Sequence, residues 1–372
     1  MKIGVPKESA DGERRVALVP DVVKSLKKNE HVDVLVESGA GVAAGHPDSQ
    51  YTDAGAEVLQ GDAAWGADVV LHVAVPSAAD IGKLSSGQLL ISHLNPWVSA
   101  ETNKALARAG ITAFAMEAIP RTTRAQAMDA LSSQAAAAGY AATLIAARES
   151  GRFFGMMTTA AGTVPPAKVL VLGAGVAGLQ AVATAKRLGA IVTGFDIRRA
   201  AWEQIASLGG RPLELDFIPD AEGEGGYARP LTDEENAQVR DALTENAAKQ
   251  DIIVTTAAIP GRPAPLLITA DAVRNMAPGS VIVDLAAETG GNCELTKPGE
   301  TVLEGGVKVI GPRNLPSEMP VPASQLYAKN LENLLGLLVD EEGKVSVNFE
   351  DDILAAACIT EGGEIKNERA AK

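Results

Sequence analysis

The sequence is poor in cysteine, histidine and aromatic residues, and it has no long apolar run. Its two cysteines, Cys293 and Cys358, suit a reducing compartment and lack any metal-ligand spacing. The four histidines are scattered along the chain, so we predict no metal site. Apolar runs stop at charged residues well short of the roughly 20 residues that a membrane helix needs. The N-terminus has charged residues around a short strand and no secretory signal pattern. These absences predict a soluble, cytoplasmic chain.

Basic residues are also in the minority. The 372 residues include 33 Lys and Arg against 47 Asp and Glu, which gives a net charge of −14. An acidic chain is repelled by nucleic acid and by anionic lipid surfaces, so we expect neither as a direct partner. At about 150 residues per domain, the length predicts two domains and a sizeable core.

A strand, a glycine-rich turn, a helix and a second strand follow one another between residues 168 and 196. The turn has the spacing G-x-G-x-x-G at Gly173, Gly175 and Gly178, and the second strand ends at Asp196, 18 residues after the last glycine. A glycine-rich turn alone is a weak signal. The same turn between a strand and a helix, with an acid at the end of the next strand, is typical of a Rossmann dinucleotide site.

Each residue of this motif has a physical role. Gly173 permits the tight turn, Gly175 lets the backbone approach a pyrophosphate, and Gly178 lets helix and strand pack closely. The helix N-terminus offers unpaired N–H groups and the positive end of its dipole to the phosphates. Asp196 is expected to accept hydrogen bonds from the adenosine ribose, which favours NAD(H) because a carboxylate repels a 2′-phosphate. Arg198 and the arginine after it leave NADP(H) as the alternative.

Strands and helices alternate through most of the chain, which predicts parallel α/β sheets. The expected strands are at residues 2–5, 32–36, 69–74, 89–93, 111–115, 251–256, 281–285 and 307–310, with early helices at 21–28 and 100–109. We therefore predict an α/β fold of two Rossmann-like domains with a cleft between them, joined by long helices at residues 125–150 and 326–339. One domain is discontinuous, residues 1–127 and 318–372. The other, residues 128–317, binds NAD(H).

Several segments are predicted to be irregular. Residues 155–166 are expected to form a loop, residues 221–230 an exposed mobile loop, and residues 361–372 a frayed end. Residues 39–44 also satisfy G-x-G-x-x-[GA] after a strand, but the polar residues that follow do not predict a helix. A turn without a helix N-terminus offers little to a phosphate, so we predict a structural turn there.

Long stretches of the chain resemble the family shared by alanine dehydrogenase and the nicotinamide nucleotide transhydrogenases. The similar stretches are VPKESADGERRVALVP at 5–20, RTTRAQAMDALSSQ at 121–134, MMTTAAGTVPPAKVLVLGAGVAGLQAVATAKRLGA at 156–190, GGYA at 225–228, TTAAIPGRPAPLLIT at 255–269 and VDLAAETGGNCELT at 283–296. Within that family the chain is most similar to the NAD(H)-binding alpha subunit (domain I) of the proton-translocating NAD(P) transhydrogenases.

The resemblance implies a homodimer that passes hydride from NADH to NADP⁺ held on a partner beta subunit. A membrane subunit would couple this transfer to proton translocation, with the present chain peripheral on the cytoplasmic face of the inner membrane. Relatives with a fused gene continue into membrane helices, so this chain is expected to be a separate soluble subunit or a piece of a longer protein. Direct transfer between two nicotinamides needs proximity and exclusion of water rather than an acid–base set.

The resemblance also assigns site residues. Those expected beside the nicotinamide, with catalytic roles for the first three, are Arg121, Gln126, Asp129 and Ser132, in one loop with Thr122 and Thr123. Those expected along the rest of the cofactor are Val176, Ile197, Arg198, Gly226 and Ala258 as backbone or wall positions, and Tyr227 at the tip of a loop that closes over the nucleotide. An ion pair between Arg121 and Asp129 would leave Gln126 free to touch either ring. Polar capping of the following helix is the alternative role for this loop.

Two other functions stay open at this point: an amino acid dehydrogenase of the alanine dehydrogenase type, and a non-catalytic NAD(H) sensor. By the resemblance, the dehydrogenase needs an arginine, a lysine, a histidine and an aspartate. Arg15 and His93 align with the first and third, but the lysine position falls in LHVAVP, where this chain has His72, and the aspartate position falls at Glu288. A structural salt bridge is an equal alternative for Arg15, and a hydrogen-bonded core histidine is favoured for His93.

Overall fold

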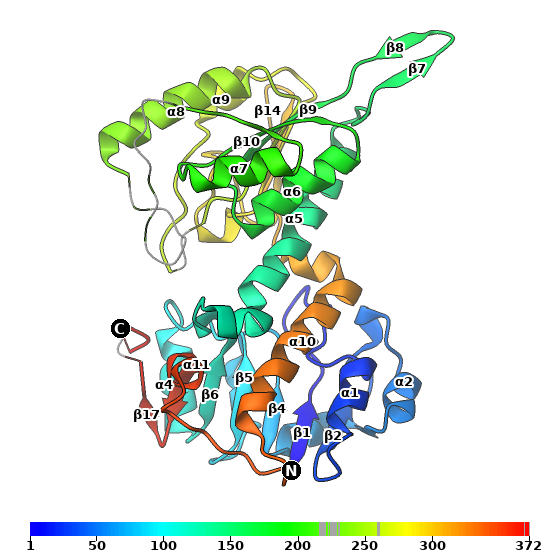
Figure 1. Ribbon diagram of the computed structural model, residues 1–372, viewed down its shortest axis with the longest axis vertical. Coiled ribbons are helices and arrows are strands. Elements are labelled where there is room, and N and C mark those ends of the chain that lie inside the picture. Colours follow the sequence, from blue (N-terminus) through cyan, green and yellow to red (C-terminus); the bar gives the residue numbers. More distant parts are fainter. Residues whose placement is uncertain are drawn as a thin grey trace. The chain divides into compact units, whose positions relative to one another are not determined.

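The computed structural model describes residues 1–215, 221, 223, 229, 231–258, 261–367 and 369–371, which form two compact units (Figure 1). The first unit contains Met1–Gln134 and Pro316–Lys372, and the second contains Ala135–Leu315. Each unit is built around its own mostly parallel sheet. The predicted α/β class with two Rossmann-like sheets is confirmed.

The first unit has an eight-stranded sheet in the order β17-β16-β6-β5-β4-β1-β2-β3. Its strands are β1 (Lys2–Val5), β2 (Asp33–Glu37), β3 (Glu57–Leu59), β4 (Val69–Leu71), β5 (Leu89–Ser92), β6 (Thr112–Ala115), β16 (Cys358–Glu361) and β17 (Glu364–Ile365). The strands from β1 to β6 pair in parallel, and β16 and β17 add an antiparallel edge. All five strands predicted in this region are present, within a few residues of the expected bounds.

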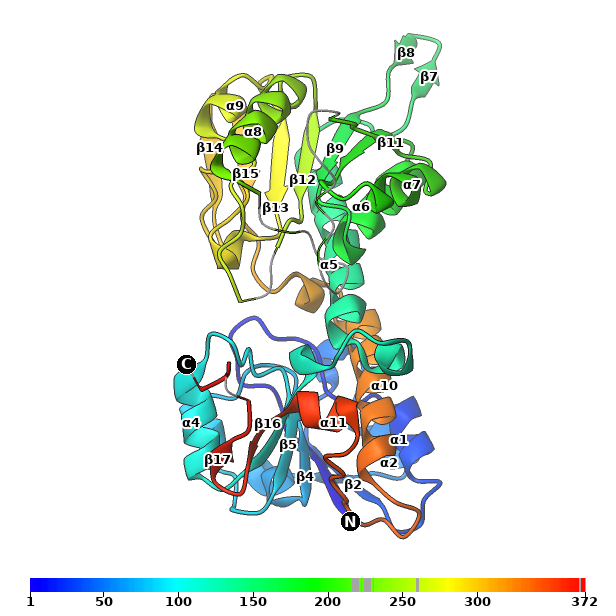
Figure 2. The ribbon, with the colours of Figure 1, turned by 60° about the vertical axis from the view of Figure 1, so that its left-hand side comes forward.

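Both faces of this sheet are buried. Helices lie on both sides of this sheet (Figure 2). Alternate residues of β5 enter different clusters: Leu89 and Ile91 pack in one cluster and Leu90 in the other. This alternation follows from the two-residue repeat of a strand. The helices of this unit are α1 (Pro20–Leu26), α2 (Asp48–Asp53), α3 (Ala78–Ile81), α4 (Ala100–Arg108), α10 (Pro320–Leu338) and α11 (Asp352–Ala357). Coverage of both faces explains why the central strands are almost wholly apolar.

The second unit has a seven-stranded sheet in the order β11-β10-β9-β12-β13-β15-β14. Its strands are β9 (Lys168–Leu172), β10 (Ile191–Phe195), β11 (Arg211–Pro212), β12 (Ile252–Thr255), β13 (Val281–Asp284), β14 (Thr301–Glu304) and β15 (Val307–Ile310). Its helices are α6 (Val176–Arg187), α7 (Ala200–Ser207), α8 (Asp233–Ala247) and α9 (Ala270–Arg274). Only β14 runs antiparallel to its neighbour among the described strands of this sheet.

The long helix expected at residues 125–150 begins later than predicted. Residues Thr123–Met128 form a 3₁₀ segment, η4, and helix α5 runs from Ala130 to Glu149, with its first residues in the first unit and the rest in the second. Alanine favours helix, but Asp129 accepts hydrogen bonds from the backbone N–H and the hydroxyl of Ser132, and so caps the helix. The cap decides the boundary. Helix α10 likewise begins earlier than residue 326, with a proline in its first turn.

Three predictions of irregular structure were wrong. Residues expected to form a loop at 155–166 contain a hairpin of β7 (Met157–Thr159) and β8 (Gly162–Val164), which pair only with each other among the described strands. The stretch after the second glycine-rich turn contains α2. The C-terminal end is tied down, because β17 pairs with β16 and Asn103 donates a hydrogen bond to the buried Ala370 carbonyl.

The second glycine-rich turn is structural, as predicted. It leads into a 3₁₀ turn at Val42–Ala44, and α2 begins only at Asp48. A Cβ on Gly41 would overlap the ring of Tyr51, whose buried hydroxyl donates to the Leu18 carbonyl at 2.9 Å. A side chain of this unit therefore fills the space that a phosphate would need.

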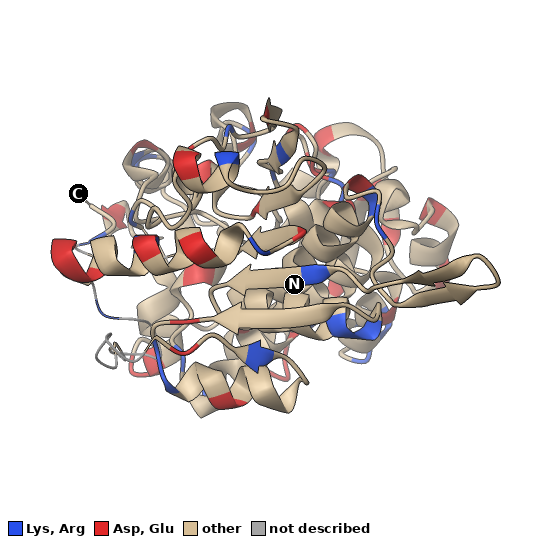
Figure 3. Ribbon diagram, turned by 90° about the horizontal axis from the view of Figure 1, so that it is seen from above, with Lys and Arg blue, Asp and Glu red and all other residues tan. Residues whose placement is uncertain are grey.

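No helix of the described part of the chain is long and apolar enough to cross a membrane. Acidic residues are spread over many helices and loops, and basic residues lie between them (Figure 3). Among the described residues, no group of three or more His, Cys, Asp or Glu side chains could hold a metal ion.

Candidate functional site

The predicted dinucleotide turn lies where the strand order of the second sheet reverses. From β9 the chain passes through α6 to β10 on one side, and later returns to β12 on the other side of β9. In open parallel sheets the carboxyl ends of the two strands at such a switch point form the ligand crevice. The turn Gly173–Gly178 follows the carboxyl end of β9 directly. Its position therefore matches that of a dinucleotide site.

The three positions of the turn require glycine for different physical reasons. Gly173 has a φ of +95°, which L side chains rarely adopt, and a Cβ there would lie 2.8 Å from the Thr256 hydroxyl. A Cβ on Gly178 would overlap the carbonyl oxygen of Gly173. A Cβ on Gly175 would meet no atom within 4 Å, so the space beside it is open. Gly173 and Gly178 are required by the fold, whereas Gly175 keeps space free beside the helix.

The N-terminus of α6 begins at a glycine, which has no side chain to cap it. Gly175 is its N-cap in an extended conformation, and no side chain among the described residues caps the first N–H groups of the helix. Val176, the first helical residue, is 40% exposed. The first four N–H groups of a helix need acceptors from elsewhere, and together with the dipole they suit a phosphate group.

Asp196 lies at the end of β10, and its carboxylate is already engaged within the chain. One oxygen accepts from the Ala174 N–H at 2.8 Å, and the Arg198 guanidinium donates to both oxygens at 2.8–2.9 Å. The Arg198 N–H adds a further bond at 2.8 Å, and the side chain of Asp196 is 8% exposed. A ribose hydroxyl that binds Asp196 must therefore share or replace the bonds of Arg198.

The structure places the other predicted cofactor residues in two groups. Val176, Ile197, Arg198 and Ala258 lie with the glycine turn in the second unit, and Ala258 is exposed just after β12. Arg121, Thr122, Thr123 and Gln126 lie together in the first unit and are all exposed, and Asp129 and Ser132 follow them there. Gly226 and Tyr227 lie outside the described residues.

The polar loop of the first unit, residues 121–129, is held by buried residues and by hydrogen bonds to neighbouring segments. Ala125 and Met128 are buried, which turns the polar residues between and before them outward. The Asn330 amide on α10 donates to the Ala127 carbonyl at 2.8 Å and accepts from the Ser133 hydroxyl at 2.7 Å. Arg124 forms ion pairs with Asp351 at 2.7 Å and with Asp352 at the start of α11. The loop is therefore held in place although its surface is polar. Capping, the alternative role, explains Asp129 and Ser132.

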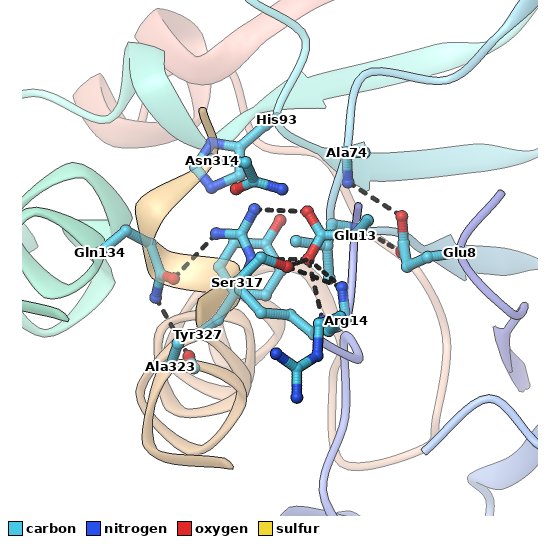
Figure 4. Close-up of polar contacts among 12 residues, drawn as sticks. Glu8, Glu13, Arg14, Ala74, His93, Gln134, Asn314, Ser317, Ala323 and Tyr327 are labelled. Atoms are coloured by element: carbon cyan, nitrogen blue, oxygen red, sulfur yellow. Dashed lines mark hydrogen bonds and ion pairs between the residues drawn. The ribbon is translucent and has the colours of Figure 1, made fainter. Parts of the chain in front are cut away.

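Arg15 forms a buried ion pair with Glu13, one of the two roles considered for it (Figure 4). Its guanidinium donates to the Glu13 carboxylate at 2.6 and 2.8 Å and to the Gln134 side chain at 2.9 Å. Burial alone would raise the pKa of Glu13, but the hydrogen bonds and charge of Arg15, with a bond from Ser317, lower it to about 2. Glu13 is therefore ionised and binds Arg15 tightly.

His72 and His93 are also paired with carboxylates. The His72 ring lies 3.2 Å from Glu8, which accepts from the N–H groups of Val73 and Ala74. The bond between Glu8 and Ala74 is drawn in Figure 4. His93 lies 3.3 Å from Glu117 and stacks on Tyr327. Both histidines thus have structural partners, as expected for His93. Sequence analysis missed all three glutamates, since burial and contacts between distant segments leave no local pattern.

The Glu13–Arg15 pair makes a stability prediction. Glu13→Gln should lower the free energy of unfolding at pH 7 by roughly 3 kcal/mol, because a fall in pKa from 4.5 to about 2 corresponds to that energy and because Arg15 is left buried without its counter-charge. A carboxyl whose pKa is lower in the folded state stabilises that state at pH values above the ordinary pKa of 4.5. This stabilisation is lost as the pH falls toward 2 and Glu13 becomes protonated. The difference between wild type and variant in denaturant unfolding should therefore shrink between pH 5 and pH 2.

The matched control is Glu342→Gln, whose side chain is 73% exposed. It should change the free energy of unfolding by less than about 1 kcal/mol. A Glu13→Gln difference that stays constant from pH 7 to pH 2 would contradict the assignment of the effect to the Glu13 charge.

Two family models cover nearly the whole chain. Residues 4–138 match the Alanine dehydrogenase/PNT N-terminal domain, and residues 142–368 match the Alanine dehydrogenase/PNT C-terminal domain.

Individual relatives agree with these models. The chain is 48% identical to an NAD(P) transhydrogenase subunit alpha protein of Rhodospirillum rubrum, over 98% of this chain and 97% of that protein. The crystal structure of transhydrogenase from Sinorhizobium meliloti is similar, with a TM-score of 0.89 and 45% identity over 98% of this chain and 100% of that one. Alanine dehydrogenase of Bacillus subtilis is 30% identical over 100% of this chain and 94% of its own length. Similarity to the transhydrogenase proteins is thus clearly higher than to that dehydrogenase.

Proposed function

We propose, since this chain belongs to the Alanine dehydrogenase/PNT family of oxidoreductases, that it is the NAD(H)-binding alpha subunit of a proton-translocating NAD(P) transhydrogenase. The observation that carries this function is the dinucleotide turn at the switch point of the second sheet, with Gly175 beside open space and Asp196 at the end of β10. The NAD(H)-binding domain is the second unit, Ala135–Leu315, which lies within the predicted residues 128–317. Hydride passes from NADH to NADP⁺ bound on the beta subunit.

The polar loop of the first unit aligns the nicotinamide of NADH. Arg121, Gln126 and Asp129 carry this role, with Thr122, Thr123 and Ser132 in contact with the same end of the cofactor. The buried anchors Ala125 and Met128 support this, because they hold the loop while its polar side chains stay exposed. Val176, Ile197, Arg198, Gly226, Tyr227 and Ala258 complete the cofactor site.

The buried charged residues of the first unit, Glu8, Glu13, Arg15 and His72, support a transhydrogenase rather than a self-sufficient dehydrogenase. The guanidinium of Arg15 is hydrogen-bonded by Glu13 and Gln134. The segment LHVAVP has no lysine to hold a substrate carbonyl, and its His72 ring lies 3.2 Å from the Glu8 carboxylate. Transfer between two nicotinamides needs no such substrate groups.

The chain works as a homodimer in complex with a membrane subunit. It lies peripherally on the cytoplasmic face of the inner membrane. The β7–β8 hairpin supports the homodimer. It extends away from the sheet of its unit, and Phe153, Met156, Met157 and Val164 on or beside it are exposed (Figure 1). An isolated two-stranded hairpin is marginally stable, and clustered apolar side chains on it are typical of a protein interface.

Reconstitution tests the function. The isolated chain should bind NADH but reduce neither pyruvate nor NADP⁺ at a measurable rate. Adding the NADP(H)-binding subunit should produce transhydrogenation. Turnover of alanine or pyruvate by the isolated chain would identify it as a dehydrogenase instead. NADH binding without activity in the complex would favour a sensor.

Nucleotide selectivity is a second expected result. NADH should bind at least tenfold more tightly than NADPH, because a 2′-phosphate beside Asp196 meets a carboxylate and loses the ribose hydrogen bonds. Asp196→Asn removes the charge but keeps the shape, and it should weaken NADH binding while narrowing the difference between the two nucleotides. Calorimetric titration of both nucleotides measures this. Equal affinities in the wild type would contradict the proposed role of Asp196 in excluding a 2′-phosphate.

A further inference from the structure

Three polar residues beside the glycine turn, two of them buried and one half-buried, belong to none of the predicted site positions. Thr256 follows β12, Asp284 ends β13, and Asn292 lies in the loop after it, all in the second unit. Asp284 and Asn292 are fully buried. Their hydrogen bonds connect the end of β13 with the turn after β9, so the geometry of that turn depends on them.

Thr256 contacts the turn directly. Its hydroxyl donates to the Gly173 carbonyl at 3.0 Å, with the Leu172 carbonyl at 3.3 Å, and its N–H donates to the Leu172 carbonyl at 2.7 Å. A Cβ on Gly173 or on Gly178 would lie within 3 Å of this hydroxyl. The hydroxyl therefore fills the space between the turn and the first turn of α6.

One peptide group of the turn is held at both ends. The carbonyl of Gly173 and the N–H of Ala174 belong to the same planar peptide unit. The carbonyl accepts from Thr256, and the N–H donates to Asp196 at 2.8 Å. With both ends bonded, this peptide plane is held against rotation, and the residues that follow it into α6 start from a fixed Ala174.

Asn292 holds the backbone next to Thr256. Its amide oxygen accepts from the Ala257 N–H at 3.0 Å, and its amide nitrogen donates to the Ala257 and Pro265 carbonyls at 2.8 Å. The N–H of Asn292 donates to Asp284 at 2.8 Å. Asp284 also accepts from Thr255, Ala286, Cys293 and Thr296. A carboxylate with this many donors has no free position, and its role is to hold the loop.

We infer that Thr256 is a positioning residue of the dinucleotide site, which orients the Gly173–Ala174 peptide for the pyrophosphate, and that Asn292 sets the position of Thr256. This inference rests on the proposed binding of NAD(H) at the glycine turn. Neither residue needs to contact the cofactor. The turn binds phosphate through backbone N–H groups, so a peptide that can rotate binds it less well.

Thr256→Val tests the inference, because it keeps the shape and removes the hydroxyl. We expect NADH and ADP to bind about tenfold more weakly, as for the loss of one well-placed hydrogen bond. Adenosine, which has no phosphate, should bind as to the wild type. Thr256→Ser keeps the hydroxyl and should restore the affinity for NADH. Affinities are measured by calorimetry or by competition with NADH fluorescence on the full chain.

Thr255→Val is the matched control. Thr255 is the preceding residue, and its buried hydroxyl donates to Asp284 at 2.8 Å without touching the turn. This variant should lower the unfolding temperature but leave the NADH affinity within about twofold of the wild type. Asn292→Ala and Thr255→Val should lower the stability by similar amounts, but Asn292→Ala should weaken NADH binding more. If Thr256→Val does not fold, Thr256→Ala takes its place.

The outcomes separate this inference from the proposed function. A wild-type chain that binds no NADH overturns both. A wild type that binds NADH, with Thr256→Val binding it equally well, overturns only the positioning role. Equal losses for adenosine and for NADH would also overturn it, since the effect would then not act through the phosphate-binding turn.

Discussion

Gln126→Asn should lower the rate of hydride transfer about 100-fold in the complex with the NADP(H)-binding subunit, while NADH affinity falls less than about threefold. The variant keeps the amide but shortens its reach by one methylene. Hydride transfer depends steeply on the distance between the two rings, and a misplacement of about 1 Å can cost on the order of 100-fold in rate. Binding depends mainly on the pyrophosphate and adenosine ends at the glycine turn and Asp196, so affinity is spared.

The position of Gln126 allows this variant to change the alignment of the nicotinamide without disturbing the fold. Gln126 is exposed on η4, whereas its neighbour Ala125 is buried and anchors the segment. A change at the exposed position should leave the fold intact. Gln60→Asn, another exposed glutamine of the first unit, is the control and should alter neither quantity. Single-turnover transfer and NADH titration are measured on the same samples. If rate and affinity fall by similar factors, the loop serves binding rather than alignment.

Gly175→Val should weaken NADH binding about 100-fold, or on the order of 3 kcal/mol, without loss of stability. The side chain would enter the open space beside the α6 N-terminus, where the pyrophosphate is expected. Gly175 has an extended backbone conformation that valine adopts readily, and its Cβ meets no atom within 4 Å. The unfolding temperature should therefore stay within a few degrees of the wild type.

Two glycines provide the comparison. Gly178→Ala should lower the unfolding temperature as well, because its Cβ would overlap the Gly173 carbonyl. Gly66→Val also places a side chain in open space, but in the first unit, and should change neither binding nor stability. NADH fluorescence titration and thermal unfolding give both quantities. Near-normal NADH affinity in Gly175→Val would exclude the glycine turn as the pyrophosphate site.

Several features of the fold could be predicted because their causes are local. The unit of β9, turn, α6 and β10 depends on glycine spacing and apolar periodicity within about 30 residues, and its strands begin and end as expected. The end of α10 and most strand positions follow from similar patterns. Element boundaries failed where one side chain decided them. Asp129 capping α5 is the clearest case, since the alanines around it favour helix on both sides.

The hairpin and the short helices were missed for a related reason. Met157 and Thr159 lie on a strand whose residues are all exposed, so it has no alternation of apolar and polar residues to reveal it. Helix α2 has only six residues, too few for a periodic pattern. The periodic pattern of apolar residues that indicates a helix or strand arises because one face of the element is buried. The β7–β8 hairpin and α2 bury few side chains, so they lack this pattern.

The sequence by itself determined the chemistry of the candidate cofactor site: glycines where the backbone must approach a phosphate, an acid at the end of the next strand, and no lysine for a keto acid. The tertiary structure decided which other groups hold that site. Thr256 meets Gly173 across 83 residues, and Ser317 meets Glu13 across 304. Such pairs depend on strand order, and the sheet brings β12 beside β9 although α6, β10, α7, β11 and α8 lie between them in the chain. Hydrogen bonds between distant segments leave no spacing in the sequence, because any polar residue that the fold brings within about 3 Å of a partner can form them.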